Sequence, residues 1–210
     1  MTYFHSKASL AVVLSKLKSF ETQKIREEQY PTPSELAAEL LWIAYMQGDL
    51  QGEIADFGCG TGILGLGALL LGCSYIHFVE KDASALAICK ENYELFLKNY
   101  PELGKVSFHH KNIASFDKKV KTVIQNPPFG TKEKHIDQVF LEKAMQCAEV
   151  VYTIHKATTK SFIDHFIDDK KFKISQYFEC LFPLKAVHNF HTKPKKNILV
   201  GIWRIEKSSK

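Results

Sequence analysis

The chain has 210 residues, of which 45% are hydrophobic and 24% are charged, and its formal net charge at pH 7 is +5. This length and composition fit one folded domain spanning residues 1–210, and they exclude a low-complexity or repeat protein. No apolar stretch approaches the roughly 18 residues that a membrane-spanning helix needs, and residues 1–20 lack a small-residue cleavage site, so we expect neither a membrane span nor a signal peptide.

The positive charge is concentrated in a basic C-terminal segment, residues 185–210. Seven Lys or Arg residues against one Glu give this segment a charge of +6, which leaves −1 for residues 1–184. A basic segment on a nearly neutral body is typical of proteins that bind a phosphate backbone. A solubilising terminus has the same composition, so charge alone leaves both interpretations open.

Five cysteines are an odd number, and no two of them have the Cys-x-x-Cys spacing of a zinc or redox site. This count argues against a disulfide framework and against a metal site within the chain. We therefore expect a cytoplasmic protein.

The N-terminal part, about residues 1–50, is expected to be a helical extension. Apolar residues recur at helical spacing over residues 8–20 and predict an amphipathic helix there. Pro31 and Pro33 interrupt the pattern, and a second helix is expected from Ser34 to Gln47 with Ser34 as its N-cap.

From residue 53 onward, strand and helix patterns alternate. Expected strands are 53–57, 75–80, 106–110, 121–125, 149–154, 173–182 and 196–205, and expected helices are 63–72, 84–98, 138–147 and 158–167. This alternation predicts an α/β fold with a mostly parallel sheet and helices on both faces. Ligands of such folds bind where the carboxyl ends of the strands meet.

The first of these strands ends in a glycine-rich turn, Asp56–Gly62, with the sequence DFGCGTG. Glycines let the backbone turn tightly and approach a ligand, and the helix that follows offers free N–H groups. Gly60, Gly62 and Gly65 also match the dinucleotide fingerprint G-x-G-x-x-G, so the turn alone does not identify its ligand.

Two carboxylates favour S-adenosylmethionine as that ligand. Asp56 precedes the glycines, where its charge would repel a pyrophosphate but accept a cationic group. Glu80 ends the next strand, where a carboxylate can bind both hydroxyls of an unmodified ribose. A ribose joined to a cationic amino acid satisfies both conditions.

Asn112 and Ile113 follow the third strand and are candidates for the adenine end of that cofactor. An amide can pair with a base edge, and Ile113 offers an apolar face. A surface Asn is the commoner reason for such a residue, so this assignment depends on its neighbours.

The fourth strand runs into VIQNPPFGTK, Val123–Lys132, and two consecutive prolines must end the sheet ladder there. An exocyclic amine is a poor nucleophile because its lone pair is delocalised into the ring. The Asn126 side-chain oxygen and the Pro127 carbonyl could accept the two hydrogens of the amine and free its lone pair. The consecutive prolines would hold that carbonyl rigidly. Phe129 offers a flat face on which a planar target can stack.

The stretches DFGCGTG, VEKD and NPPF, in this order, resemble the class I, Rossmann-like S-adenosylmethionine-dependent methyltransferases that methylate amines. The stretches EEQYPTPSELAAELL, NPPFGTK and VVYTIHKATT are more specific. They resemble the small-subunit rRNA adenine-N6 methyltransferases of eukaryotes and archaea, the methyltransferase-like protein five group. The resemblance implies a seven-stranded sheet whose C-terminal strand is antiparallel.

The resemblance also implies roles for individual residues. The cofactor-binding residues would be Gln29, Tyr30, Thr32, Asp56, Gly58, Gly60, Thr61, Gly62, Ile63, Glu80, Asn112 and Ile113. The catalytic residues would be Asn126, Pro127, Pro128 and Phe129, and the RNA-binding residues would be His155, Lys156, Phe190, His191, Lys193, Lys195 and Lys196. Family members more usually carry Asp at the position of Asn112. They also pair with a small zinc-binding activator protein that adds to their sheet edge.

The expected activity is therefore methylation of an adenine N6 in RNA, most specifically small-subunit rRNA. Guanine-N2 methylation of rRNA and N5 methylation of a protein glutamine remain alternatives, because both use the same Asn-Pro-Pro-aromatic loop. A non-catalytic RNA-binding subunit is disfavoured by the intact Asn126. A nicotinamide-dependent oxidoreductase would account for the glycines but would leave Asp56 and the two prolines unexplained.

Overall fold

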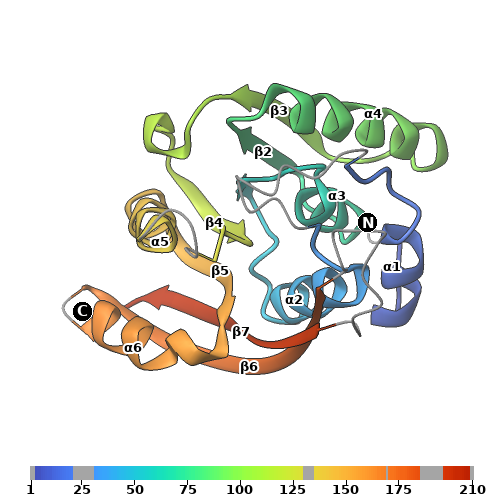
Figure 1. The fold of residues 1–210 in the computed structure, drawn as a ribbon. Helices are drawn as coiled ribbons and strands as arrows, with labels where there is room; N and C mark the ends of the chain where they lie inside the picture. The colour runs from blue at the N-terminus through green and yellow to red at the C-terminus, as the bar shows by residue number, and fades with distance from the viewer. Residues whose placement is uncertain (1–2, 21–30, 130–134, 169, 185–195, 209–210) are drawn as a thin grey trace.

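The structure is a computed structural model of the chain, and it describes residues 3–20, 31–129, 135–168, 170–184 and 196–208. Its strands are β1 (Glu53–Phe57), β2 (Tyr75–Glu80), β3 (Lys105–His110), β4 (Val120–Gln125), β5 (Ala148–Lys156), β6 (Phe172–Leu184) and β7 (Lys196–Lys207). They form one seven-stranded sheet in the order β3-β2-β1-β4-β5-β7-β6 (Figure 1). Neighbouring strands pair in parallel except that β7 is antiparallel to both β5 and β6. The expected mostly parallel sheet with an antiparallel C-terminal strand is confirmed.

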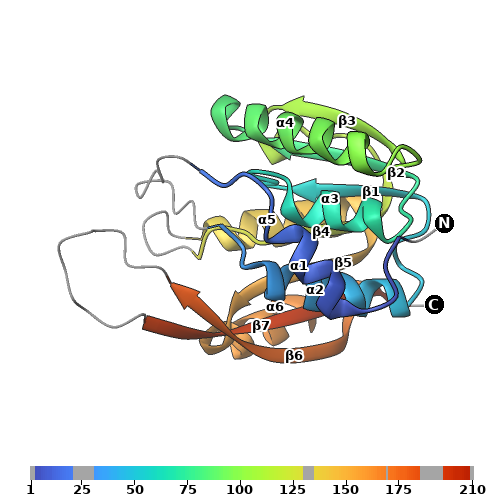
Figure 2. The same cartoon turned by 90° about the vertical axis from the view of Figure 1, so that its right-hand side faces the viewer.

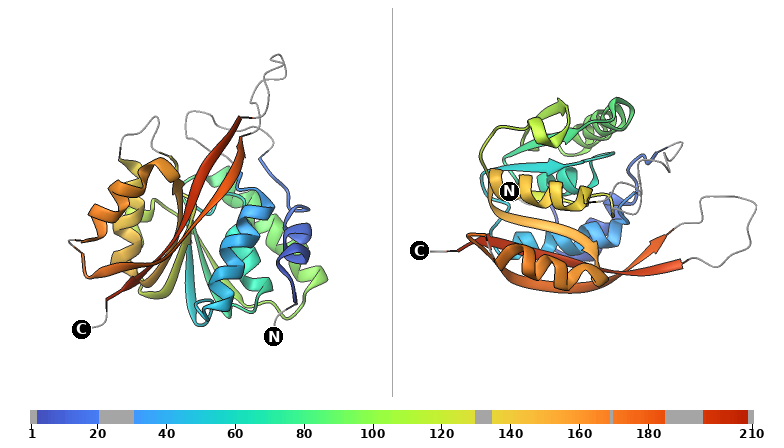
Figure 3. Two further views of the ribbon diagram at one scale, coloured as in Figure 1. Left: turned by 90° about the horizontal axis from the view of Figure 1, so that it is seen from below. Right: turned by 60° about the vertical axis from the view of Figure 1, so that its left-hand side comes forward.

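Helices cover both faces of this sheet, as predicted. They are α1 (Lys7–Leu14), α2 (Ser34–Met46), α3 (Ile63–Leu70), α4 (Ala83–Asn99), α5 (Ile136–Cys147) and α6 (Lys160–Asp168), with short 3-10 turns η2 (Ile113–Ser115) and η3 (Ala157–Thr159). Helices α1 to α4 pack into one apolar cluster and α5 and α6 into the other. The ribbon views show these two groups of helices on opposite sides of the sheet (Figures 2 and 3). Successive strand residues point to opposite faces, so Ile54 belongs to the first cluster and Ala55 to the second.

The parallel register aligns the carboxyl ends of the three central strands. Phe57 of β1 is paired with Val79 of β2 on one side and with Gln125 of β4 on the other. The residues that come next are Gly58, Glu80 and Asn126. Three of the expected site residues therefore leave the sheet side by side at one edge.

A buried charge network around Asp49 joins the segment before β1 to β5 and β7. Asp49, which is 5% exposed, accepts hydrogen bonds from the Tyr152 hydroxyl at 2.7 Å and from Arg204 Nε at 2.8 Å. A buried carboxylate is tolerated only when its oxygens are paired in this way. The network joins the turn after α2 to β5 and β7, so it ties the N-terminal helices to the C-terminal half of the sheet.

The N-terminal helices differ in detail from the prediction. Helix α1 ends at Leu14 instead of residue 20, because the chain beyond it turns to bond with the distant Asn92 of α4. Helix α2 begins at Ser34, and Pro33 occupies the N-cap position that was expected for Ser34. A proline just before a helix has a backbone angle that suits this boundary.

Within the described residues, none of the helices combines the length and apolar character required to cross a lipid bilayer.

We predict that Gly65→Ala destabilises the fold by about 1–3 kcal/mol, the usual range for overpacking a core. Gly65 lies in α3, and a Cβ there would come within 2.3 Å of the Phe78 ring on β2. Urea unfolding of the wild type, of the Gly65→Ala and Phe78→Leu single variants and of the Gly65→Ala/Phe78→Leu double variant provides the measurement. The Gly65→Ala cost should shrink in the Phe78→Leu background, and an unchanged cost there would contradict the steric explanation.

Candidate active site

The glycine-rich turn after β1 is built from left-handed backbone conformations. Gly58, Gly60 and Gly62 have φ angles of 64°, 54° and 91°, which side-chain-bearing residues rarely adopt. Space is also limiting, because a Cβ on Gly62 would lie 2.5 Å from the Cys89 sulfur of α4. The turn thus requires glycine for its own geometry, independently of any ligand.

Glu80 holds this turn in place. Its Oε2 accepts the Gly60 backbone N–H at 3.0 Å, and its Oε1 accepts the Asp82 backbone N–H at 2.9 Å. The side chain is 7% exposed. One carboxylate therefore connects the turn after β1 to the turn after β2, and each oxygen retains a second acceptor position.

Asp56 lies directly beneath the turn and is 1% exposed. Its Oδ2 accepts the Gly65 backbone N–H at 2.8 Å, in the first turn of α3. Burial raises the pKa of Asp56 to about 7; the Gly65 N–H opposes this shift, and the nearby charge of Glu80 adds to it. Burial therefore favours the protonated form of Asp56 well above the pH range in which an Asp side chain usually ionises.

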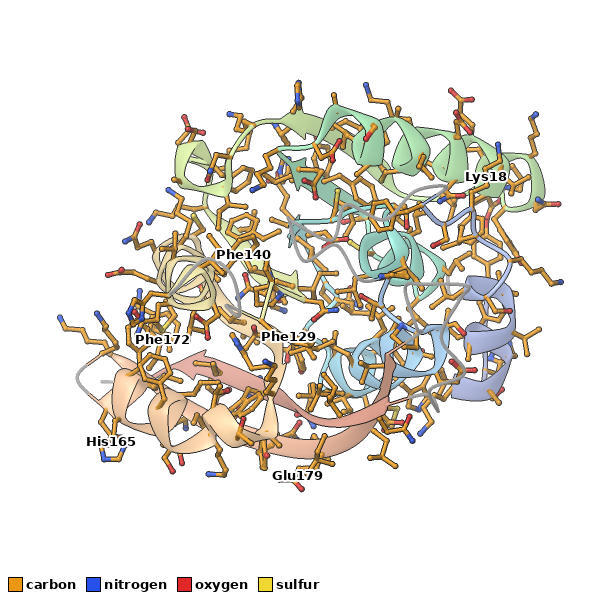
Figure 4. All side chains as sticks on the ribbon, in the orientation of Figure 1. Lys18, Phe129, Phe140, His165, Phe172 and Glu179 are labelled. Carbon is orange, nitrogen blue, oxygen red and sulfur yellow. The ribbon has the colours of Figure 1, made fainter. Side chains whose placement is uncertain are left out.

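Asn92 is a structural residue whose role is not apparent from the sequence pattern. It is fully buried in α4, and its Nδ2 donates to the carbonyl oxygens of Lys18 and Thr61, both at 3.0 Å. Its Oδ1 accepts the Lys18 backbone N–H at 2.9 Å. One amide thus joins the glycine turn to the segment after α1, where Lys18 lies beside α4 (Figure 4).

Asn112 and Ile113 occupy the turn after β3. Asn112 is exposed, and its Oδ1 accepts the Ala114 N–H at 3.0 Å as the N-cap of η2. Ile113 is 5% exposed and belongs to the apolar cluster on the α5 side of the sheet. Both residues therefore have a structural role of their own, and their contact with an adenine ring stays a prediction.

Asn126 follows β4 directly and is held by a residue from the N-terminal extension. Its Nδ2 donates to Thr32 Oγ1 at 2.9 Å. Its Oδ1 is buried and has no hydrogen-bond partner among the described residues. A buried acceptor without a donor costs about 1–3 kcal/mol, so this oxygen is suited to meet a donor from outside the chain.

The rest of the loop provides a rigid and partly exposed surface. Pro127 is buried, and Pro128 and Phe129 are half-buried. The Lys156 ammonium at the end of β5 lies 5.7 Å from the centre of the Phe129 ring. In Figure 4 Phe129 lies near the centre of the view, below Phe140 of α5.

His155 does not face outward with Lys156. It is 3% exposed, contacts the Trp203 ring edge-on, and lies with its Nε2 2.7 Å from Thr153 Oγ1. Burial lowers its pKa to about 3, so the ring is neutral. This placement argues against the expected contact between His155 and an RNA backbone.

Several expected site residues lie outside the described residues. They are Gln29, Tyr30, Phe190, His191, Lys193 and Lys195. Lys196 begins β7.

We predict that the stability of the protein falls with rising pH through Asp56. Below its unfolded pKa near 4 the group is protonated in both states; between pH 4 and 7 only the native state keeps the proton, so unfolding becomes easier as pH rises. Relative to Asp56→Asn, the wild type should lose up to about 4 kcal/mol of unfolding free energy across this window. Urea unfolding at intervals from pH 4 to 8 measures the difference, and parallel curves for the two proteins would refute the assignment.

Comparison with known proteins places this geometry in a family. Residues 35–150 match the family described as the methyltransferase small domain. The chain is 36% identical over 196 residues to the rRNA N(6)-adenosine-methyltransferase METTL5 of Danio rerio, with 91% of this chain and 94% of that protein covered. It is 33% identical over 198 residues to Mettl5 of Drosophila melanogaster, which bears the same enzyme name, with 92% of each chain covered.

A solved structure is also similar to this chain in both fold and sequence. The crystal structure of the Pyrococcus horikoshii protein PH1948 superposes with a TM-score of 0.87 at 39% identity, covering 98% of this chain and all of that one. The chain therefore belongs to the methyltransferase small domain family and, within it, to the METTL5 group.

Proposed function

We propose that this protein transfers a methyl group from S-adenosylmethionine to the N6 amine of an adenine in small-subunit rRNA. The observation that carries this proposal is the buried Asn126 Oδ1, an acceptor that no described residue satisfies, at the same sheet edge as Gly58 and Glu80. Adenosine N6 in rRNA is the target that the names of the METTL5 relatives state.

The residues at this edge fit the cofactor. The glycine turn brings backbone close to a ligand, and Glu80 keeps a second acceptor position on each oxygen for ribose hydroxyls. Asp56 stays beneath the turn, where it stabilises the start of α3. When bound, S-adenosylmethionine supplies an electrophilic methyl group on a cationic sulfur.

Asn126 and Pro127 prepare the amine for attack. Asn126 Oδ1 accepts one hydrogen of the exocyclic amine and the Pro127 carbonyl accepts the other, which draws the nitrogen toward tetrahedral geometry and frees its lone pair. Pro127 and Pro128 have no N–H that could compete for these acceptors. The excess proton leaves the methylated amine to solvent, so no general base is needed.

Phe129 and Lys156 receive the target nucleotide. The half-buried ring stacks on the extruded base, and the neighbouring ammonium pairs with an adjacent phosphate. The basic segment 185–210, which includes Lys193, Lys195 and Lys196, adds sequence-independent affinity for the RNA backbone.

A small zinc-binding activator is proposed as a protein partner, and strand β3 is proposed as its docking edge. Among the described residues, β3 and β6 each have only one neighbouring strand. Strand β6 contains a register shift between Ile174 and Gln176 and a proline at position 183, both of which discourage pairing with another strand. Strand β3 has neither feature.

The five free cysteines support a cytoplasmic location.

We expect Asn126→Ala to lower methyl transfer to small-subunit rRNA about 100-fold or more, the usual effect of removing a preorganised polar group at a reacting centre. Cofactor affinity should change only a few-fold, because Asn126 acts on the amine. Labelled S-adenosylmethionine, purified rRNA and nucleoside mass spectrometry give the rate and the product, and calorimetric titration gives the affinity. N2-methylguanosine, or label in protein, would overturn the substrate; normal transfer by the variant would overturn the mechanism.

Mixing the chain with the zinc-binding activator of its own organism should give a one-to-one complex in size-exclusion chromatography. In hydrogen exchange, the amides of residues 105–110 should become protected in the complex. Protection of β6 would move the interface to the other edge of the sheet, and failure to form a complex would remove the activator from the proposal.

A further inference from the structure

Thr32 and Asn126 are 94 residues apart in sequence and are joined by a single hydrogen bond of 2.9 Å. Thr32 lies between Pro31 and Pro33, just before α2, and Asn126 lies at the end of β4. Among the described residues, Thr32 is the one hydrogen-bond partner of the Asn126 side chain. The family resemblance implies a cofactor-binding role for Thr32, and that role does not involve the Asn126 amide.

Thr32 is the described partner of the Nδ2 end of the amide; because a hydroxyl can also donate, it is the substrate amine, itself a donor, that selects Oδ1 as the facing end. Because Nδ2 donates to Thr32 Oγ1, Oδ1 is the end that remains without a described partner. A side-chain amide can rotate by half a turn and exchange its two ends. In the rotated state Nδ2 would face the substrate amine, so two donors would oppose each other and the lone pair would not be freed.

We propose that Thr32 is a positioning residue that holds the Asn126 amide with its nitrogen engaged and its oxygen facing the target amine. With the substrate amine in place, this orientation satisfies both ends of the amide: Thr32 accepts from Nδ2, and the amine donates to Oδ1. Without the Thr32 hydroxyl, the Nδ2 end loses its one described hydrogen-bond partner, so the amide is no longer held in this orientation. The inference rests on the proposed function.

Thr32 is flanked by a proline on each side. The two prolines beside it restrict its backbone, so the hydroxyl is presented at a nearly fixed position. The N-terminal extension thereby contributes to the geometry of the methyl-accepting side of the site, as well as to the expected cofactor side.

Thr32→Val and Thr32→Ser form a matched pair for the test. Val keeps the shape of the side chain and removes the acceptor, whereas Ser keeps the hydroxyl and removes a methyl group. We expect Thr32→Val to lower kcat, measured at saturating S-adenosylmethionine, about 10- to 100-fold, to leave the KM for rRNA within about threefold, and to be largely rescued in Thr32→Ser. Circular dichroism and urea unfolding verify that each variant is folded; Thr32→Ala replaces Thr32→Val if the latter is not.

A double variant measures the coupling between Thr32 and Asn126. If Thr32 acts through Asn126, Thr32→Val should cause no further loss in an Asn126→Ala background. Unchanged kcat in Thr32→Val, a loss that appears only as weaker cofactor binding, equal loss in Thr32→Ser, or additive losses in the double variant would each overturn the inference.

The outcome separates this inference from the proposed function. A wild-type protein that forms no N6-methyladenosine overturns both. An active wild type with an inactive Asn126→Ala variant, together with a fully active Thr32→Val variant, retains the function and overturns only the role of Thr32.

Discussion

The parallel register of β1, β2 and β4 is the constraint on which the site depends. A shift of one residue in either pairing would turn the side chains of a strand to the other face and separate the strand ends. The observed register instead brings Gly58, Glu80 and Asn126 to one edge. Both apolar clusters enforce it, because each strand contributes alternate residues to both. The same burial that stabilises the sheet therefore sets the geometry of the site.

Polar groups beneath the glycine turn extend this constraint from the sheet to the loops. Glu80 fixes two neighbouring turns through their backbone amides, and Asn92 fixes the glycine turn through the Thr61 carbonyl. Asp56 supports the start of α3 at a cost, since burial raises its pKa to about 7. Because the native state binds this proton more tightly than the unfolded chain does, the Asp56 carboxyl lowers the free energy of unfolding as the pH rises.

Most of the architecture was predictable because it follows from local patterns. Alternating strands and helices determine an α/β sheet, and residues at strand ends must collect at one edge, which is why Glu80 and Asn126 could both be assigned to the ligand-binding edge. Tertiary contacts were not accessible in this way. The early end of α1 and the role of Asn92 depend on one amide that meets a segment 74 residues away. His155 shows the same limit, because strand alternation does not reveal that β7 would cover it with Trp203.

The hydrogen bond between Thr32 and Asn126 connects the N-terminal extension to the proposed catalytic loop. An Asn-Pro-Pro-Phe loop can fix its own backbone through the prolines, but prolines do not control the rotation of a neighbouring side-chain amide. That control requires a partner from elsewhere, and in this chain a hydroxyl just before α2 provides it. Helix α2 is in turn packed in the same cluster as α3, which starts at the glycine turn. The acceptor proposed to meet the substrate and the turn proposed to meet the cofactor are therefore held by one continuous set of contacts, and a substitution at either is expected to alter the other.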